Sequence, residues 1–380
     1  MVIPASSSFS LRDPTFSSAP SFSLHNFRPP PNNSQQLTAD GVVATYEAST
    51  LSKGVGVYHS GEGHPMKPHR LTLNNHLVIS YGLHQRIDVY EPRVATKEEL
   101  EMFHDEDYVD FLARITPDNI RHFTSLVSWT TGVAINWTGG LHQAEKSEAS
   151  GFCYVNDVVL AILELLRVDA RVRYVDINLN HGGDVQEASS NLNRALAVSF
   201  HKYSPNFPVT GHIDELGHTL GKYFSLNSIM GPTIDTFRPS AIVLQCGTDS
   251  FGNDRTGCFS IAAHGECVRF IKSFDLPLVV LGGGGYTIKN VSRCWTYGTA
   301  VLLGLMQDLP NALSPHTAYD DFFAPDWKLH PEVVGGRNRL ENLDSRKQLE
   351  RIRVDVLELL RHMAGASGLQ MSEVPPSLAS

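Results

Sequence analysis

The strongest constraint on the fold is a repeated alternation of helix-like and strand-like segments from about residue 41 onward. Short apolar runs of strand length are separated by stretches whose apolar residues recur at helical spacing. The expected strands are 42–48, 133–137, 171–179, 195–200, 240–247 and 276–285, and the clearest expected helices are 69–83, 157–168 and 346–363. Because the strands are apolar on both faces, they predict a central parallel sheet flanked by helices, which is an α/β domain.

The two ends of the chain differ from this pattern. Residues 1–40 are rich in Ser and Pro and contain only Asp13 and Asp40 as acids, a composition that favours disorder. An organelle transit peptide is the alternative for this segment, because it is Ser-rich and poor in acids. We therefore expect three parts, which are a disordered segment 1–40, one domain 41–363, and a short tail 364–380.

Composition and charge exclude several classes of protein. The chain of 380 residues has a net charge of −9, which argues against direct DNA binding and suits basic partners. No apolar run approaches the roughly 20 residues of a membrane-spanning helix, so no membrane association is expected. The five cysteines form no CxxC pair, which is typical of reduced thiols in an intracellular protein.

Polar residues follow several of the expected strands. Ligands of parallel α/β sheets bind beyond the carboxyl ends of the strands, so these positions are candidate site residues. They are Asp176, Asn178, Asn180 and His181 after one strand, Thr248 and Asp249 after a second, Tyr286 after a third, and residues 139–143 after a fourth.

Six ordered segments carry a more specific signal. They read GHPMKPHR (63–70), FHDEDYVDFL (103–112), GGLHQAEKSEASGFCYVNDV (139–158), SFHKY (199–203), QCGTDS (245–250) and LGGGGYTIKNVSRCWTY (281–297). Together they resemble the signature blocks of class I histone deacetylases, and FFAPDWKLHP (322–331) resembles the histone deacetylase 3 branch. The resemblance covers about residues 42–375 and implies a single domain of the arginase/deacetylase type.

The resemblance implies a reaction and its setting. Family members hydrolyse N-acetyl-lysine on histones with a zinc ion, which represses transcription. Two aspartates and one histidine hold the zinc, two adjacent histidines with supporting aspartates move protons, and a tyrosine stabilises the oxyanion. The implied partners are histone tails or other acetylated proteins and subunits of corepressor complexes. The implied location is the nucleus, with the cytoplasm as a second location.

Position by position, the resemblance implies an altered metal site. Asp249 matches the third zinc ligand, whereas Asn178 and Asn180 stand where the family has an aspartate and a histidine. His181 matches the following histidine and, with Asp184, is a candidate substitute ligand. One carboxylate and two carboxamides balance the charge of Zn²⁺ poorly, and amide oxygens suit calcium or magnesium better. We therefore do not expect this chain to hold the zinc of its family.

The proton-transfer groups are also altered. His142 is retained, and Asp176 stands where the family has its supporting aspartate. Gln143 replaces the second histidine and cannot titrate, so it cannot act as a general base. Gly183 falls where the second supporting aspartate is expected, and Tyr286 matches the oxyanion tyrosine. Satisfied core histidines and a packed aromatic are the alternatives for the retained residues.

Other positions match binding sites of the family. They are Phe152 and Phe207 for the walls of the acetyl-lysine channel, Thr256 for its rim, Asp176 and Ser199 for a potassium ion, and His59, Gly63, Lys67, Arg255 and Lys289 for an inositol phosphate. A solvated basic patch is the alternative for the last set. The family also has several dozen more residues between Phe123 and Ala134 than this chain.

These observations lead to one hypothesis and two alternatives. We expect a deacetylase homologue that is catalytically impaired and acts as a scaffold or competitor within corepressor assemblies. The first alternative is an active zinc-dependent lysine deacetylase with rearranged ligands. The second is a non-catalytic reader of acetyl-lysine.

Overall fold

The computed structural model describes residues 44–47, 63–90, 95–115, 132–189, 193–201, 225–226, 231–252, 254, 257, 259–313, 319–332 and 345–362. These residues belong to one compact unit, which spans residues 37–380. Outside the described residues lie the expected disordered segment 1–40, the tail 364–380, and the candidate positions His59, Phe207, Arg255 and Thr256.

The described strands form one sheet. They are β1 (Ala44–Glu47), β2 (Asp88–Tyr90), β3 (Val133–Asn136), β4 (Val172–Asp176), β5 (Ala195–Ser199), β6 (Ser225–Leu226), β7 (Ala241–Gln245) and β8 (Leu278–Leu281). Their order across the sheet is β2-β1-β3-β8-β7-β4-β5-β6, and neighbouring strands are parallel throughout. Parallel neighbours require crossover connections, which the intervening helices supply. The predicted α/β architecture with a central parallel sheet is confirmed.

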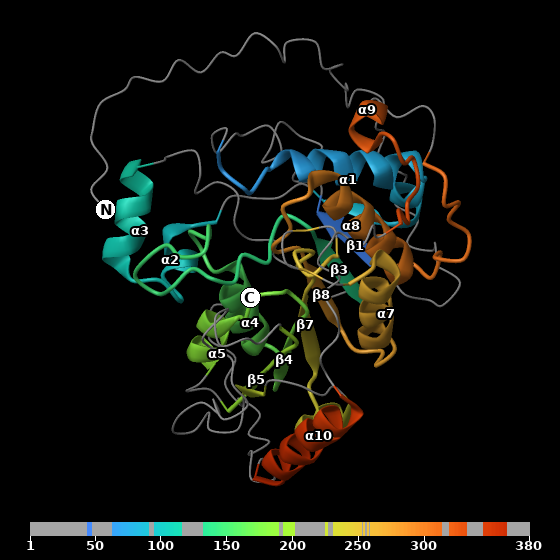
Figure 1. The fold of residues 1–380 in the computed structure, drawn as a ribbon. Helices are drawn as coiled ribbons and strands as arrows, with labels where there is room; N and C mark the ends of the chain where they lie inside the picture. Colours follow the sequence, from blue (N-terminus) through green and yellow to red (C-terminus); the bar gives the residue numbers. More distant parts are fainter. Residues whose placement is uncertain are drawn as a thin grey trace. The chain divides into compact units, whose positions relative to one another are not determined.

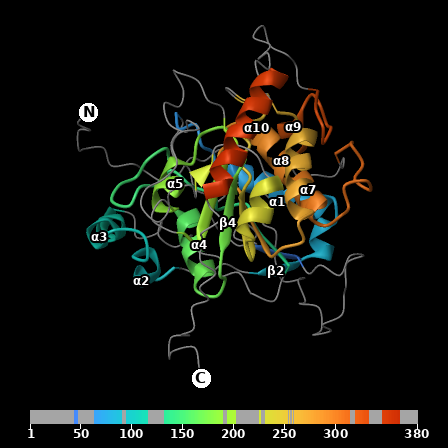
Figure 2. The same ribbon diagram turned by 90° about the horizontal axis from the view of Figure 1, so that it is seen from below.

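Helices cover both faces of this sheet (Figures 1 and 2). One layer contains α1 (His69–Ser80), α7 (Ile261–Lys272) and α8 (Ile288–Leu302), and the other contains α4 (Asp157–Leu166) and α5 (Gly183–Ser189). On the first side, α6 (Gly231–Phe237) and α10 (Arg346–Arg361) pack against β5. The shorter or peripheral helices are α2 (Lys97–Leu100), α3 (Glu106–Ile115) and α9 (Asp320–Phe323). None of the described helices is long and apolar enough to cross a bilayer.

Side chains of the central strands alternate between the two layers. In β7, Ile242 and Leu244 face the α1, α7 and α8 side, while Ala241 and Val243 face α4 and α5. Complete burial of a side chain such as Leu244 contributes about 1.5–3 kcal/mol relative to its exposure. The central strands β4, β5, β7 and β8 therefore have no solvent-facing side, which explains why their sequences contain consecutive apolar residues.

The strand that leads to the candidate site is shorter than the sequence predicts. We expected a strand over 171–179, but β4 ends at Asp176. The Asp176 carboxylate accepts a hydrogen bond from the backbone N–H of Asn178 at 2.9 Å, which turns the chain out of the sheet. Asn178 and Asn180 consequently lie in the loop beyond the strand rather than within the strand.

Candidate functional site

The candidate residues converge at the carboxyl edge of four neighbouring strands. Asp176 ends β4, and three loops follow the other strands, with His142 beyond β3, Asp249 beyond β7 and Tyr286 beyond β8. Because the strands are parallel and adjacent in the order β3-β8-β7-β4, these loops meet at one end of the sheet.

His142 and Asp176 form a buried pair. His142 Nδ1 donates to Asp176 Oδ2 at 2.8 Å, and the Tyr174 hydroxyl donates to the same oxygen at 2.7 Å. Burial alone would raise the pKa of Asp176, but attraction to His142 and these hydrogen bonds lower it. Burial likewise disfavours the charged form of His142, yet the Asp176 charge raises the pKa of His142 above its ordinary value. The hydrogen bond to Asp176 therefore fixes the orientation of the His142 ring.

The Asn178 carboxamide contacts the other nitrogen of His142. Asn178 Nδ2 lies 3.3 Å from His142 Nε2 and donates to it when the imidazole is neutral. Asn178 is buried, and its Oδ1 atom has no hydrogen-bond partner within the described part of the chain. A carboxamide offers either an N–H or a C=O after a half-turn, so Asn178 can pair with the neutral or the protonated imidazole.

Asp249 is paired by neutral groups. Its Oδ1 atom accepts from the backbone N–H of Leu179 at 3.0 Å, and its Oδ2 atom accepts from Asn180 Nδ2 at 3.1 Å. Burial raises the pKa of Asp249 to about 6, against the opposing effects of the Leu179 hydrogen bond and His142. The carboxylate that matches a zinc ligand is therefore desolvated, and among the described residues no cationic side chain lies at hydrogen-bond distance from it.

These donors do not fit a zinc ion. Zinc prefers thiolate, imidazole and carboxylate ligands, and here Asn178 and Asn180 direct amide N–H groups at His142 and Asp249. In the described part of the chain, no three His, Cys, Asp or Glu side chains are grouped so that they could hold a metal ion. The carboxamides thus contact both the one retained zinc-type ligand, Asp249, and the proton-transfer residue His142.

The candidate substitute ligands have other partners. His181 Nε2 donates to Gln186 Oε1 at 2.6 Å, and its ring lies 4.6 Å from that of His201. Asp184 is more than half buried next to Gly183 at the start of α5, and burial followed by repulsion from Glu145 raises its pKa to about 6. Neither side chain joins Asp249 in a group able to hold a metal.

Gln143 packs against Gly151, the residue before Phe152. A Cβ atom added at Gly151 would lie 1.5 Å from Gln143 Oε1, so the glutamine side chain fills the space against this glycine. The adjacent Phe152 has a positive φ of 69° and is 44% exposed. Its ring lies 4.8 Å from that of His64 and 6.4 Å from that of Tyr286. The Phe152 ring is therefore partly exposed beside the loop that carries Tyr286.

Arg70 holds the glycine-rich loop that carries Tyr286. Its guanidinium donates to the carbonyl oxygens of Gly283 and Gly285, each at 2.7 Å, and lies 5.0 Å above the Trp295 ring. Burial lowers the pKa of Arg70 to about 10, which leaves it charged at neutral pH. Burial also raises the pKa of Tyr286 to about 12, so its hydroxyl remains a hydrogen-bond donor. Although Arg70 lies in the block 63–70, no sequence pattern indicates its contact with Gly283, which is 213 positions away in the chain.

Asp157 holds the loop that carries His142. Its carboxylate is fully buried and accepts from the backbone N–H groups of Gly140 at 2.8 Å and Leu141 at 2.9 Å. Burial raises the pKa of Asp157, and these two hydrogen bonds oppose that shift. Asp157 is the first residue of α4 and lies within the block 139–158. Its place in that block is the sequence signal that could have marked it as a site residue.

We expect Asp157→Asn to lower the free energy of unfolding by about 1–3 kcal/mol. Asp157 now accepts hydrogen bonds from two backbone N–H groups, one on each carboxylate oxygen. The carboxamide has only one oxygen, so one of these N–H groups would lose its partner. Urea denaturation at pH 7 measures the change. The exposed Asp107→Asn is the matched control, and equal stability of the two variants would contradict the role of Asp157.

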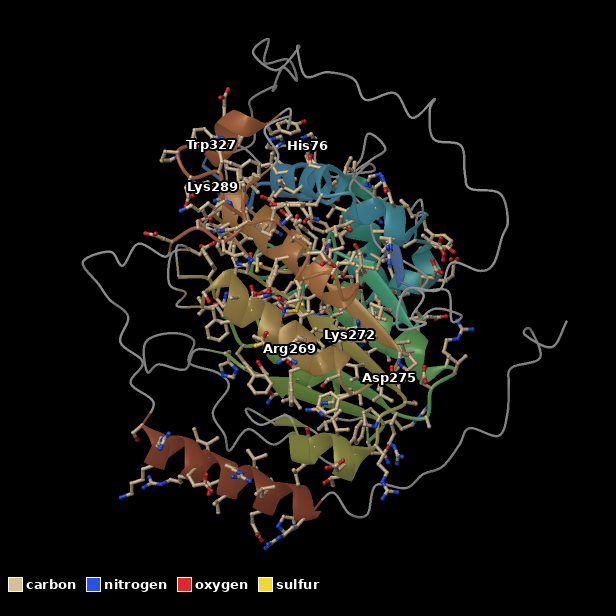
Figure 3. The ribbon with its side chains drawn as sticks, turned by 90° about the vertical axis from the view of Figure 1, so that its right-hand side faces the viewer. His76, Arg269, Lys272, Asp275, Lys289 and Trp327 are labelled. Carbon is tan, nitrogen blue, oxygen red and sulfur yellow. The ribbon has the colours of Figure 1, made fainter. Side chains whose placement is uncertain are left out.

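The remaining described candidate positions are Lys289, Gly63, Lys67 and Ser199. Lys289 Nζ donates to the Ala324 carbonyl oxygen at 3.2 Å, and Figure 3 places it near Trp327 at one end of the molecule. Gly63 is exposed and Lys67 is half-buried. Ser199, expected near a potassium ion with Asp176, lies opposite Asp176 where β5 pairs with β4. Its hydroxyl contacts His201 Nδ1 at 2.9 Å.

Comparison with known proteins identifies the family. A profile of the histone deacetylase domain matches residues 118–231 and 225–302. Histone deacetylase B of Dictyostelium discoideum is 45% identical over 86% of this chain and 90% of its own length. The chain belongs to the histone deacetylase family. Histone deacetylase 1 of Homo sapiens and that of Bos taurus are each 41% identical, over 84% of this chain and 76% of their own length. These relatives support the class I assignment that the sequence blocks predicted.

Proposed function

We propose that this histone deacetylase homologue is a pseudoenzyme that lacks zinc-dependent deacetylation and acts through binding. The observation that carries the proposal is the pairing of His142 and Asp249 with carboxamide N–H groups of Asn178 and Asn180. A zinc ion would have to displace both contacts and would then meet a single carboxylate. Loss of one partner that merely orients a metal ligand commonly costs about 10–100-fold in affinity or activity, and loss of direct ligands costs more.

The proton-transfer residues support the same proposal. Hydrolysis of an amide needs a group that takes a proton from water and returns it to the leaving amine. His142 keeps its Asp176 partner, but Gln143 has no titratable atom and is packed against Gly151. Tyr286 can stabilise an oxyanion only after a nucleophile has attacked, so its retention does not restore the reaction.

The alternative of an active enzyme with rearranged ligands needs His181 or Asp184 beside Asp249. The hydrogen bond from His181 to Gln186 and the distance between the His181 and His201 rings argue against that rearrangement. We therefore favour a role as a scaffold or competitor in nuclear corepressor assemblies, with acetylated or lysine-rich histone tails as partners. The resemblance of 322–331 to the histone deacetylase 3 branch suits such a role.

The test is the zinc content and deacetylase activity of the purified full chain. We expect far less than one zinc ion per chain after mild chelation, and release of acetate from acetylated histone peptides at the rate of the enzyme-free control. Histone deacetylase 1 of Homo sapiens, prepared in the same way, is the positive control. One tightly held zinc per chain together with turnover would overturn the proposal.

A further inference from the structure

His104 is a buried histidine whose two ring nitrogens both meet backbone groups. It lies between α2 and α3 and is only 2% exposed. Its Nδ1 atom lies 3.2 Å from the carbonyl oxygen of Lys146, and the backbone N–H of Asn156 donates to Nε2 at 3.0 Å. A carbonyl oxygen can only accept and a backbone N–H can only donate, so the two partners select the neutral ring with its proton on Nδ1.

Asn156 connects this imidazole to the loop that carries His142. Its side chain is fully buried, and Nδ2 donates to the carbonyl oxygens of His142 at 3.2 Å and of Ala144 at 3.0 Å. Its Oδ1 atom caps the first turn of α4. Asn156 therefore holds the backbone on both sides of Gln143, and His104 in turn holds the backbone of Asn156.

The far end of the same loop is also fastened at His104. The Lys146 carbonyl oxygen that faces the His104 ring accepts a second hydrogen bond, from the backbone N–H of Asp105 at 3.1 Å. Lys146 Nζ and Asp105 Oδ1 are 2.9 Å apart, but both side chains are largely exposed, and exposed ion pairs contribute little to stability. The buried hydrogen bonds of His104 are therefore the stronger restraint on the loop.

Protonation of His104 would break one of these hydrogen bonds. A proton on Nε2 would face the N–H of Asn156, so that two donors meet. Burial lowers the pKa of His104, against the opposing effects of the Lys146 and Glu145 backbone and of the Asp105 charge. The titratable side chains on the segments around His104 are Glu101, Asp105, Tyr108, Glu145, Lys146 and Asp157.

The direction of the pH dependence follows from these contacts. When the loop detaches, water reaches the ring and restores the ordinary pKa of His104, which is 6.5. The detached form then takes up a proton more readily than the closed form, so acid favours detachment. The effect begins below about pH 6.5, and above that pH the ring is neutral in both forms.

We propose that His104 is a positioning residue that holds the loop 142–146 in place only while its imidazole is neutral. The loop contains His142 and Gln143, so the geometry of the site depends on the state of a side chain outside the site. The inference goes beyond the proposed function, because it applies whether or not the chain holds zinc.

Hydrogen exchange of the full chain at several pH values tests the inference. The reporters are peptides that contain the backbone N–H groups of Asp105, Glu145 and Asn156, whose hydrogen bonds involve the loop or His104. After correction for intrinsic rates, we expect them to exchange at least about tenfold faster at about pH 5 than at about pH 7.5, the scale of leaving one buried donor without a partner. Peptides from α8 should not change. Equal corrected rates at both pH values would overturn the inference.

Two substitutions of His104 separate positioning from a merely structural role. His104→Gln keeps one donor and one acceptor and cannot be protonated, so exchange should stay slow at both pH values. His104→Leu removes both contacts, so exchange should be fast at both. His84→Gln, a matched change of a half-buried histidine after α1, should exchange like the natural chain.

His104→Gln also excludes the other groups that titrate in this range. Asp184 and Asp249 each have a pKa raised to about 6, chiefly by burial, and both remain in this variant. Exchange that still rises in acid in His104→Gln would therefore overturn the inference, even if His104→Leu does not fold. Nuclear magnetic resonance of nitrogen-labelled histidines gives the direct readout, and the signal that His104→Gln removes should show a proton on Nδ1 at neutral pH. A proton on Nε2 instead would equally contradict the role of His104.

Discussion

Restoring the two lost ligand types together, by Asn178→Asp and Asn180→His, is expected to raise the zinc affinity of this chain by at least about 100-fold. The new aspartate and histidine would join Asp249, so that the site offers two carboxylates and one imidazole in all. This set balances the charge of Zn²⁺ and matches its preferred ligands. It would also remove the amide N–H groups that now face His142 and Asp249. Competition with a chromophoric chelator measures the affinity, and elemental analysis gives the stoichiometry.

The same double variant should be less stable than the natural chain when metal is absent. Asp at position 178 adds a third buried carboxylate close to Asp176 and Asp249, and an uncompensated buried charge costs about 3–5 kcal/mol. Zinc should restore the loss, because a ligand that binds only the folded state stabilises it. We therefore expect the unfolding temperature to fall in chelator and to rise with added zinc.

Adding Asp249→Asn to the double variant provides the control, since it should abolish the gain in zinc affinity. If the double variant binds zinc no better than the natural chain, the substitutions are not the cause of the loss. The shortened segment between Phe123 and Ala134 would then be the next candidate. Deacetylation should return only when Gln143→His and Gly183→Asp are added, because proton transfer needs those groups as well.

The sheet was predictable because its strands are buried on both faces. The runs that contain β3, β4, β5, β7 and β8 are apolar at consecutive positions, and burial on both sides is the physical reason. β2 and β6 have three and two residues, which is too short for any periodicity to appear. The end of β4 was misplaced because the turn depends on a hydrogen bond that the Asp176 carboxylate accepts from the backbone N–H of Asn178, which apolar patterning does not record.

The chemistry of the site was only partly predictable. The family resemblance supplied the positions of His142, Asp176 and Asp249, and the structure brings their loops to one edge of the sheet. The sequence identified Asn178 and Asn180 as weak zinc ligands but could not say where their amide groups point. That direction depends on contacts between residues far apart in the chain, such as the 69 positions that separate Asn180 from Asp249. The donor and acceptor pattern of the site comes from these contacts.

Replacing Arg70 with methionine is expected to lower the free energy of unfolding by about 2–4 kcal/mol. Arg70 is fully buried and donates two short hydrogen bonds to carbonyl oxygens of the glycine-rich loop, at Gly283 and Gly285. Hydrogen bonds from a charged donor contribute about 1.5–3 kcal/mol each, and the desolvation of the guanidinium offsets part of that sum. Contact with the Trp295 ring adds to the loss, since methionine keeps the volume but not the charge.

Urea denaturation at pH 7 measures this change against Arg86→Met, a matched substitution of an exposed arginine that should alter stability by less than about 0.5 kcal/mol. Lysine at position 70 should recover only part of the loss, because one ammonium cannot reproduce the planar fork that reaches two carbonyl oxygens. If Arg70→Met is as stable as Arg86→Met, the glycine-rich loop is held by other contacts and Arg70 does not position it.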